Sequence, residues 1–341
     1  QHAGGRAALS RGDVDAWVAQ ELGWTLERLH AVAAPEQIDA VAMAIDSHLR
    51  GYGFLLGDMT GVGKGRTLAL LAVYAVNHDI PILFLTERAN LMKDFMRDIY
   101  DIGAEDILKP YIMNSQVKIR HDKEIVLTGA SVAQNRALTA SGAFPEGCNA
   151  VMATYSQFNR PESAKTAWLR AVAPGAMVIS DESHNAAGDS NIYETMSEVM
   201  NKAAISIFSS ATWAKEVKNL GYYARLFPQE FRNRGSEIGE IISRGGQPMQ
   251  EIMSAMLVRM GVYLRREHDA SKLELAYLTD EKYVARNRDL LNRFAPVLQA
   301  MAYLSGDIDD ISARLRRQQK DMLRQAKGSR EEEGYSRARG R

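Results

Sequence analysis

The sequence of 341 residues is poor in cysteine, in net charge and in long apolar runs. Cys148 is the one cysteine, which excludes an intramolecular disulfide and any zinc or iron–sulfur site built from cysteines. The longest apolar run, Leu68–Val76, has nine residues. A membrane-spanning helix needs roughly 20, so we expect no contact with a membrane. Lys and Arg together number 42, as do Asp and Glu, which excludes a histone-like polycation.

Other properties are those of an ordinary globular protein. Hydrophobic residues make up 46% of the chain, too many for a mostly disordered protein. At about 150 residues per domain, the length predicts two domains. No apolar segment follows Arg6 and Arg11, so we predict no secretory signal and an intracellular protein.

The apolar pattern predicts alternating helices and strands. Helical spacing covers Asp13–Leu29, with Asp13 as N-cap, and a second helix follows Pro35. Further helices are expected at Thr67–Asn77 and Asn90–Tyr100, and a β excursion at Asn114–Val132. Continuous apolar runs predict buried strands at Tyr52–Leu56, Pro81–Leu85, Ala150–Ala153, Ala176–Ile179 and Ile205–Phe208. This alternation is typical of an α/β fold with a mostly parallel sheet and helices on both faces.

A glycine-rich loop between an expected strand and helix is the sharpest local feature. The loop reads Asp58-Met59-Thr60-Gly61-Val62-Gly63-Lys64-Gly65-Arg66-Thr67, and we predict that residues 60–67 bind a nucleotide. Gly61 and Gly63 let backbone N–H groups turn toward phosphate oxygens, and Lys64 would reach the β- and γ-phosphates. A turn with a chance lysine is the alternative, which the strand before and the helix after disfavour.

The loop departs from most phosphate loops at Gly65, where a Ser or Thr usually binds Mg²⁺. Thr67 lies two residues further on and is expected to point elsewhere. We therefore expect the metal to be held by an acidic residue and waters, which Mg²⁺ tolerates.

Two adjacent carboxylates end the expected strand Ala176–Ile179. Asp181 and Glu182 lie in Ser180-Asp181-Glu182-Ser183-His184, and Asp181 is 117 residues after Lys64. We predict that Asp181 holds Mg²⁺ and that Glu182 orients and deprotonates the attacking water. His184 would link this loop to a neighbouring one. A solvated acidic turn is the alternative for this motif taken alone.

Ser210-Ala211-Thr212 follows the fifth expected strand. An ordinary turn explains these three residues equally well in isolation. These residues come third along the chain, after the glycine-rich loop and the acidic motif, and this order fits a coupling loop. Its hydroxyls could hydrogen-bond the acidic motif.

The order of these three motifs resembles the first RecA-like lobe of superfamily 2 helicases. The loop with its unusual Gly65-Arg66 is similar to that of the strawberry notch family of helicase-like ATPases. The segments Ala153–Ser156, Asn219–Tyr222 and Gly261–Arg266 also resemble parts of that family, and the similarity extends from about residue 35 to residue 290. Arg265 and Arg266 resemble the end of lobe one in Swi/Snf-type translocases.

The resemblance implies a DNA-dependent ATPase that uses ATP and Mg²⁺. In related motors Gln37 would read adenine, and Arg88, Asn90, Thr154, Tyr155 and Ser156 would face the DNA backbone without reading its sequence. It also implies a second RecA-like lobe with arginine fingers. Such a lobe does not fit in the residues after 290, so we expect an incomplete motor that is slow alone. Among family members, a bacterial or phage-infected cytoplasm is favoured over a nucleus.

We expect four regions in the chain. These are a helical lead (1–50), the RecA-like lobe (51–228), an insertion and lobe-closing segment (229–285), and a helical basic tail or linker to a second lobe (286–341). Residues 311–341 carry a net charge of +6 and the rest −6, so the tail either extends a DNA surface or is a solvated helix. The methionines at 249, 253, 256 and 260 are expected in the core rather than on an interaction face.

We compare three function classes with these sequence features. The preferred one is an ATP-hydrolysing DNA translocase lobe. The alternative is a nucleotide-binding interaction module of a larger polypeptide, phage or mobile-element, with little turnover. A P-loop kinase or GTPase is disfavoured by the acidic and Ser-Ala-Thr motifs and by the absence of a guanine-recognition signature.

Overall fold

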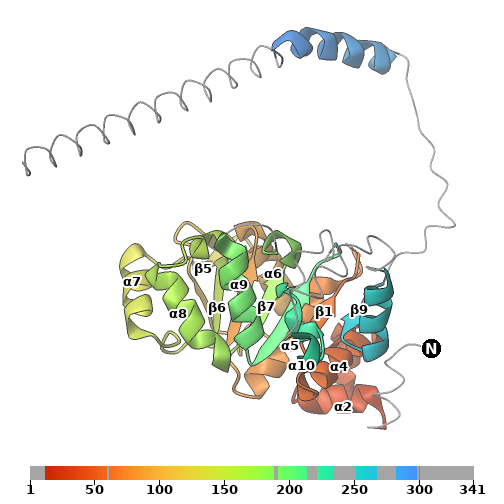
Figure 1. Ribbon diagram of the computed structural model, residues 1–341, viewed down its shortest axis with the longest axis vertical. Helices are drawn as coiled ribbons and strands as arrows, with labels where there is room; N and C mark the ends of the chain where they lie inside the picture. Colours follow the sequence, from red (N-terminus) through yellow and green to blue (C-terminus); the bar gives the residue numbers. More distant parts are fainter. Residues whose placement is uncertain are drawn as a thin grey trace, which may run out of the picture. The chain divides into compact units, whose positions relative to one another are not determined.

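A computed structural model describes residues 12–59, 61–187, 191–212, 221–232, 251–266, 282–297 and 299. The chain divides into two compact units, residues 1–269 and 270–341. The first unit contains the sheet and all the candidate site residues (Figure 1). In the second unit, residues 282–297 are helical.

The first unit is built on a parallel sheet of seven strands in the order β3-β6-β2-β7-β8-β1-β9. The strands are β1 (Phe54–Leu56), β2 (Ile82–Thr86), β3 (Pro110–Ile112), β6 (Ala150–Thr154), β7 (Met177–Asp181), β8 (Ile205–Ser209) and β9 (Tyr263–Leu264). Every pairing within this sheet is parallel. The carboxyl ends of all seven strands therefore meet at one edge, where open α/β sheets bind their ligands.

Helices cover both faces of the sheet (Figure 1). One face packs against α2 (Val14–Glu21), α3 (Leu26–Val32), α4 (Pro35–Leu49), α5 (Lys64–Asn77) and α6 (Ala89–Asp101). The other packs against α7 (Val132–Ser141), α8 (Ala164–Val172), α9 (Asn191–Lys202) and the helical residues 251–260. Strand alternation explains the division, because Ile82 and Phe84 point to the first face while Leu83 and Leu85 point to the second.

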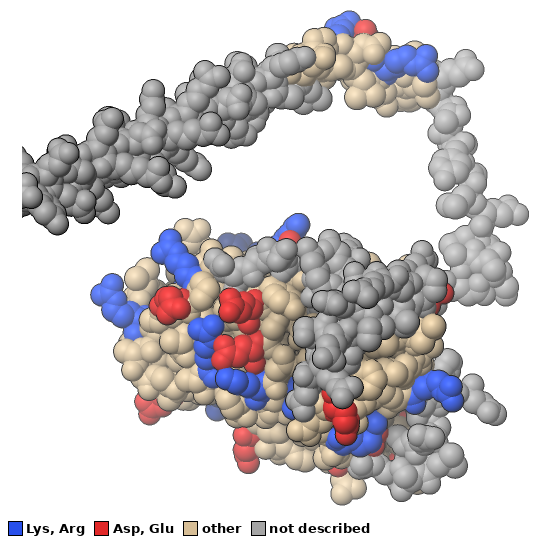
Figure 2. Space-filling model, viewed as in Figure 1, with Lys and Arg blue, Asp and Glu red and all other residues tan. Residues whose placement is uncertain are grey.

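Short elements complete the unit. The strands β4 (Lys118–His121) and β5 (Glu124–Thr128) form a separate antiparallel pair, as expected for residues 114–132. Single turns are η1 (Tyr155–Phe158), η2 (Ala173–Gly175), η3 (Ser183–Asn185), η5 (Ala224–Leu226) and the short α10 (Gln229–Arg232). On the face in Figure 2, acidic and basic side chains are interspersed, which matches the neutral total.

The five strands and the α/β class predicted from the sequence are confirmed. The single helix predicted over Asp13–Leu29 is wrong. Gly23 has a φ of +64°, which ends α2, and Thr25 caps α3 by accepting the N–H of Arg28. The N-cap Asp13 is confirmed, since its side chain accepts two backbone N–H groups at the start of α2.

The division into four regions stays a prediction. The sheet takes β9 from the segment 229–285, and α4 from the lead packs beside β1. Met253 is buried, and Met256 and Met260 pack against the core, as expected for the methionines that the structure describes. Residues 300–341 of the tail lie outside the described residues. Among the described helices, none is both long and apolar enough to span a bilayer.

Candidate nucleotide site and polar groove

The glycine-rich loop joins β1 to α5 at the carboxyl edge of the sheet. Gly61 and Gly63 both have a φ of +93°, a conformation that side chains with a Cβ rarely adopt. Gly63 is the N-cap of α5, and Lys64 is the first residue of that helix. The first N–H groups of a helix have no intrahelical partner and carry partial positive charge, so this turn fits an anion.

The remaining loop residues are placed as follows. Val62 is half-buried, and Thr60 lies outside the described residues. Thr67 is fully buried, and its hydroxyl has no partner among the residues described. Arg66 directs its guanidinium away from the loop, to the Val32 carbonyl (3.0 Å) and the Asp101 carboxylate (3.0 Å). The nucleotide roles of these residues stay predictions, and for Arg66 only the backbone N–H is left to face a phosphate.

Two side chains fill the space beside the loop glycines. Gln37, in the first turn of α4, accepts the Ala34 N–H (3.0 Å) through Oε1. Its Nε2 lies where a Cβ on Gly63 would overlap it. A Cβ on Gly65 would likewise overlap the carboxylate of Asp98, from α6. The loop is therefore closely covered at both positions, and a side chain at residue 65 requires the Asp98 carboxylate to move.

The entry to the loop is clamped by an ion pair. Asp58 is fully buried, and its Oδ1 accepts from Nε (3.0 Å) and from the backbone N–H (2.9 Å) of Arg266. Arg266 Nη2 donates to Asp58 Oδ2, and Nη1 donates to the Glu36 carbonyl. The Met59 N–H donates to the Arg266 carbonyl at 3.0 Å. One arginine thus joins the loop, the end of β9 and the first turn of α4.

The acidic motif lies at the end of β7. Asp181 Oδ1 accepts from Ser209 Oγ (2.9 Å), and Oδ2 lies 3.5 Å from Thr86 Oγ1. Burial raises the pKa of Asp181 to about 6, against the Ser209 hydrogen bond and the Lys64 charge, which both lower it. Glu182 follows with φ +49° and ψ +47°. The two carboxylates of this turn are both half-buried, and the charge of Lys64, at the start of α5, acts on that of Asp181.

This donor set fits a magnesium ion held together with a nucleotide. Mg²⁺ takes one or two carboxylates, with waters and phosphate oxygens as its other ligands. No group of three or more His, Cys, Asp or Glu side chains suited to a metal occurs in the part of the chain described. Asp181 would hold the ion here, and the ion would supply positive charge to the phosphates.

The loop of residues 210–212, which is expected to act in coupling, is joined to the acidic motif by a hydrogen bond. His184 Nδ1 lies 2.9 Å from Ser210 Oγ and 3.4 Å from Glu182 Oε2. Ser210 is fully buried, and it also accepts the Thr212 N–H (3.2 Å). Ala211 is half-buried beside them. The hydrogen bond expected between the third motif and the acidic motif is present, while its role in coupling stays a prediction.

The expected nucleic-acid residues divide into exposed and buried ones. Arg88, Asn90 and Ser156 are exposed, and Arg88 Nε lies 3.5 Å from Glu87. Thr154 is buried and pairs with Asn114, which accepts its N–H (3.0 Å) and donates to its Oγ1 (2.8 Å). The structure differs from our expectation at Tyr155, which is 3% exposed and donates its hydroxyl to the Asp181 carbonyl (2.7 Å). A phosphate contact by that hydroxyl does not follow from this position.

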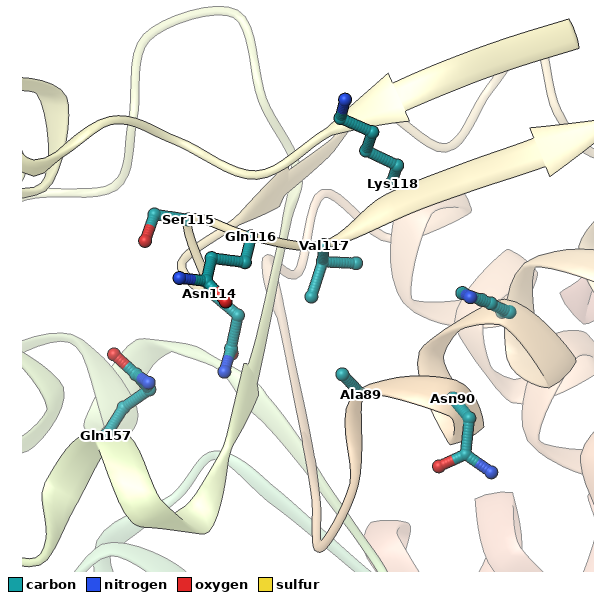
Figure 3. A pocket seen from close by; sticks show the side chains of 9 residues that line it. Ala89, Asn90, Asn114, Ser115, Gln116, Val117, Lys118 and Gln157 are labelled. Carbon is teal, nitrogen blue, oxygen red and sulfur yellow. The ribbon is translucent and has the colours of Figure 1, made fainter.

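A polar groove of about 420 Å³ opens next to these residues. Figure 3 shows Asn114, Gln116 and Gln157 on one side and Ala89 and Asn90 on the other. The lining comprises two lysines, four carboxamides, one hydroxyl and two apolar residues, namely Lys93, Lys118, Asn90, Asn114, Gln116, Gln157, Ser115, Ala89 and Val117. None of these residues is acidic, so the groove suits an anion. We call it the polar groove.

The comparisons with known proteins agree with this geometry. Residues 28–282 match the model of the family described as P-loop containing NTP hydrolase pore-1. The chain belongs to this family. It is also similar to curated strawberry notch proteins, with 27% identity over 255 residues to the Caenorhabditis elegans homolog and 28% over 248 residues to homolog 2 of Homo sapiens. The resemblance inferred from the motifs is thus confirmed.

The chain spans only a small part of these relatives. The two alignments cover 68% of this chain but 13% and 17% of the relatives. Protein FORGETTER 1 of Arabidopsis thaliana is 26% identical over 71% of this chain and 19% of its own length. Among solved structures, the Sulfolobus solfataricus SWI2/SNF2 ATPase core in complex with dsDNA has a TM-score of 0.47 and 18% identity, over 69% of this chain and 45% of that one.

Sequence reasoning missed several residues of this P-loop NTP hydrolase site. Asp58 is visible in the sequence as part of the loop, but its burial, and with it the need for a paired cation, is not. Arg266, which supplies that cation, is 208 residues away in the chain. Lys93, Lys118 and Gln157, which line the polar groove, carry no motif, and only Lys118 lies in the irregular stretch 114–132.

Proposed function

We propose that the chain is the first RecA-like lobe of an ATP-driven, helicase-like motor that moves on DNA. The observation that carries this proposal is that Lys64, the first residue of α5, and Asp181, the last residue of β7, both lie at the carboxyl edge of one parallel sheet. Membership in a P-loop NTP hydrolase family supports the nucleotide half. An intracellular location is part of the same proposal.

The nucleotide would be bound by ATP-specific and phosphate-specific contacts. Gln37 would hold adenine beside the loop, while the N–H groups that begin α5 and the Lys64 ammonium hold the β- and γ-phosphates. Asp181 would hold Mg²⁺, which neutralises phosphate charge. Glu182 would accept a proton from the attacking water and orient it, the role that a carboxylate beside the metal serves in phosphoryl transfer.

The DNA backbone would lie along the polar groove. Asn90, Lys93 and Lys118 line it, and exposed Arg88 precedes it in the chain. Ammonium, guanidinium and carboxamide groups donate to phosphate oxygens without reading the base sequence. The contact is therefore expected to be insensitive to sequence and sensitive to salt.

A second RecA-like lobe, from the full-length protein or in trans, would complete the motor. The alignments cover between 13% and 20% of the length of the strawberry notch relatives. Arginine fingers contribute about 10³–10⁵ to the rate of phosphoryl transfer in NTPases that use them. We therefore expect ATP binding by this chain and slow hydrolysis without the partner lobe.

The test is ATP binding and hydrolysis with and without duplex DNA. Lys64→Ala should abolish binding of a fluorescent ATP analogue, and Glu182→Gln should preserve binding but stop hydrolysis. Lys109→Ala, which removes an exposed lysine outside the site, should behave as wild type. A wild-type chain that does not bind the analogue, or a Lys64→Ala chain that binds it normally, would refute the nucleotide assignment.

The alternative is a nucleotide-binding interaction module with little turnover. Gly65 favours it, because the residue that usually supplies a hydroxyl to Mg²⁺ has no side chain here and Asp98 fills the space. The same experiment separates the two. Tight binding with no hydrolysis, even when DNA and the partner lobe are present, supports the module.

A further inference from the structure

A buried chain of hydroxyl groups lies behind the acidic motif. Ser180, the residue before Asp181 in β7, is fully buried, and its Oγ contacts the hydroxyls of Tyr155 (2.7 Å) and Tyr222. Tyr155 donates to the carbonyl of Asp181 at 2.7 Å. All four residues are thus joined at the base of the turn that carries the two carboxylates.

The direction of these hydrogen bonds follows from counting protons. Burial raises the pKa of Tyr155 and of Tyr222 well above that of free tyrosine, so each keeps one proton. The Tyr155 proton goes to the Asp181 carbonyl, which can only accept. Ser180 must then donate to Tyr155, and Tyr222 must donate to Ser180. The chain has one direction, from Tyr222 to the Asp181 backbone.

A second tyrosine holds the other end of the turn. Tyr223, also fully buried, pairs with Ser183 at 3.0 Å. Glu182 lies between the two serines in the left-handed region, at φ +49°. That conformation costs about 1–3 kcal/mol and persists only where neighbouring contacts impose it. The hydrogen bonds of Tyr155 to Ser180 and of Tyr223 to Ser183 lie on either side of it.

The same chain reaches the polar groove. Tyr155 is the first residue of η1, and Gln157 of that turn lines the groove. Asn114, also in the groove lining, is bonded to the backbone and side chain of Thr154. An occupant of the groove that displaces Asn114 or Gln157 would therefore also displace the turn that contains Tyr155.

We propose that Tyr155 and Tyr222 are positioning residues that transmit occupancy of the polar groove to the Asp181–Glu182 turn. The inference rests on the proposed function, because it takes nucleic acid as the occupant and ATP as the ligand of the turn. Neither tyrosine touches the reacting atoms. Their hydroxyls set the position of the Asp181 backbone, and so of both carboxylates.

The variants Tyr155→Phe and Tyr222→Phe remove one hydroxyl each and keep the ring. The measured quantity is the factor by which saturating duplex DNA changes the affinity of the full chain for a fluorescent ATP analogue. Each variant should reduce this coupling factor toward one. The reduction should be about 2- to 30-fold, the range found for residues that carry coupling. Affinity for ATP alone and for DNA alone should stay close to wild type. Tyr111→Phe, which breaks a tyrosine hydrogen bond to Asn135, is the control and should keep the coupling.

The possible outcomes distinguish a failure of this inference from a failure of the proposed function on which it rests. Unchanged coupling in both folded variants, as judged by circular dichroism, would overturn it. Loss of DNA binding by Tyr155→Phe would also overturn it, because the hydroxyl would then contact DNA directly. An equal loss of ATP affinity with and without DNA would show a merely structural role. A wild-type chain that binds no ATP analogue would instead refute the proposed function, and this inference with it.

Discussion

Arg266 neutralises Asp58 across 208 residues of sequence, with both carboxylate oxygens engaged. Asp58 is fully buried at the entry of the glycine-rich loop, while the Arg266 side chain keeps 20% of its surface exposed. A buried charge of this kind is tolerated only when it is paired. The position of the loop is therefore set by a residue that lies outside every nucleotide motif.

Replacement of Arg266 tests this clamp. Arg266→Ala should destabilise the lobe by about 3–5 kcal/mol, because it leaves Asp58 buried and unpaired. Arg266→Lys should have a stability between those of wild type and Arg266→Ala, since lysine keeps the charge but not the paired geometry. Chemical denaturation measures both. Arg97→Ala, which removes an exposed side chain paired with Asp94 (3.1 Å) and Asp98 (3.6 Å), should cost less than about 1 kcal/mol. A similar cost for Arg97→Ala and Arg266→Ala would contradict the clamp.

Restoring a hydroxyl at residue 65 should harm the protein. Gly65→Ser places a Cβ where the Asp98 carboxylate lies, so the half-buried Asp98 side chain must turn away, at a cost of about 0.5–1.5 kcal/mol. Asp98→Ala should recover most of that loss in the double variant, so the two effects should not add. Thermal unfolding of the four proteins of this cycle measures the coupling. Simple additivity would mean that Asp98 does not restrict residue 65.

The pKa of Asp181 gives a pH dependence with a definite sign. Its pKa rises from 3.8 to about 6 on folding, mainly because of burial. The folded state therefore binds this proton more tightly, and stability without ligands falls as the pH rises from about 4 to above 6, by up to about 3 kcal/mol. Asp181→Asn should lack this loss and should be the more stable protein at pH 8.

The measurement is denaturant unfolding of both proteins at several pH values. The stability gap should narrow as the pH falls from about 6 and close by about pH 3, where Asp181 is largely protonated in both states. Asp94→Asn, at an exposed position, is the control and should show no such gap. An Asp181→Asn protein that is less stable than wild type at pH 8 would contradict the burial argument.

The polar groove predicts a salt effect. Lys93→Gln and Lys118→Gln should each weaken binding of duplex DNA and lower the slope of log affinity against log salt by about 1. Equilibrium titrations over a range of NaCl concentrations measure the slope. Lys202→Gln, which changes an exposed lysine paired with Glu198 on α9, should leave the slope unchanged. Equal slopes for all three variants would place the DNA elsewhere.

Features formed by residues close together in the chain could be predicted from the sequence, whereas contacts between distant segments could not. Phosphate-loop glycines and the Asp181–Glu182 pair are visible because each motif fits within ten residues beside an apolar strand. The break between α2 and α3 was missed because Val18, Leu22 and Leu26 keep a helical spacing across it. Strand β3 was missed because only Ile112 of its three residues is buried, and β9 because two residues are too short for a pattern.

The misplacement of Tyr155 has a different cause. Its position after a strand predicts a loop at the ligand edge, which is correct, but the direction of its ring depends on the space beside Ser180 and Tyr222. No local pattern encodes that space. Contacts between segments far apart in the chain decide which side chains at the edge face solvent and which face the core.

The pairing of β9 with β1 has a consequence for the order in which the lobe forms. Strand β1 and the loop after it are made early, yet the Gly57 and Met59 N–H groups and the Asp58 carboxylate find their partners only in residues 264–266. Contacts between such distant segments form late in folding. A growing chain that has not yet added residues 264–266 therefore lacks the partners of the Gly57 and Met59 N–H groups and of the Asp58 carboxylate.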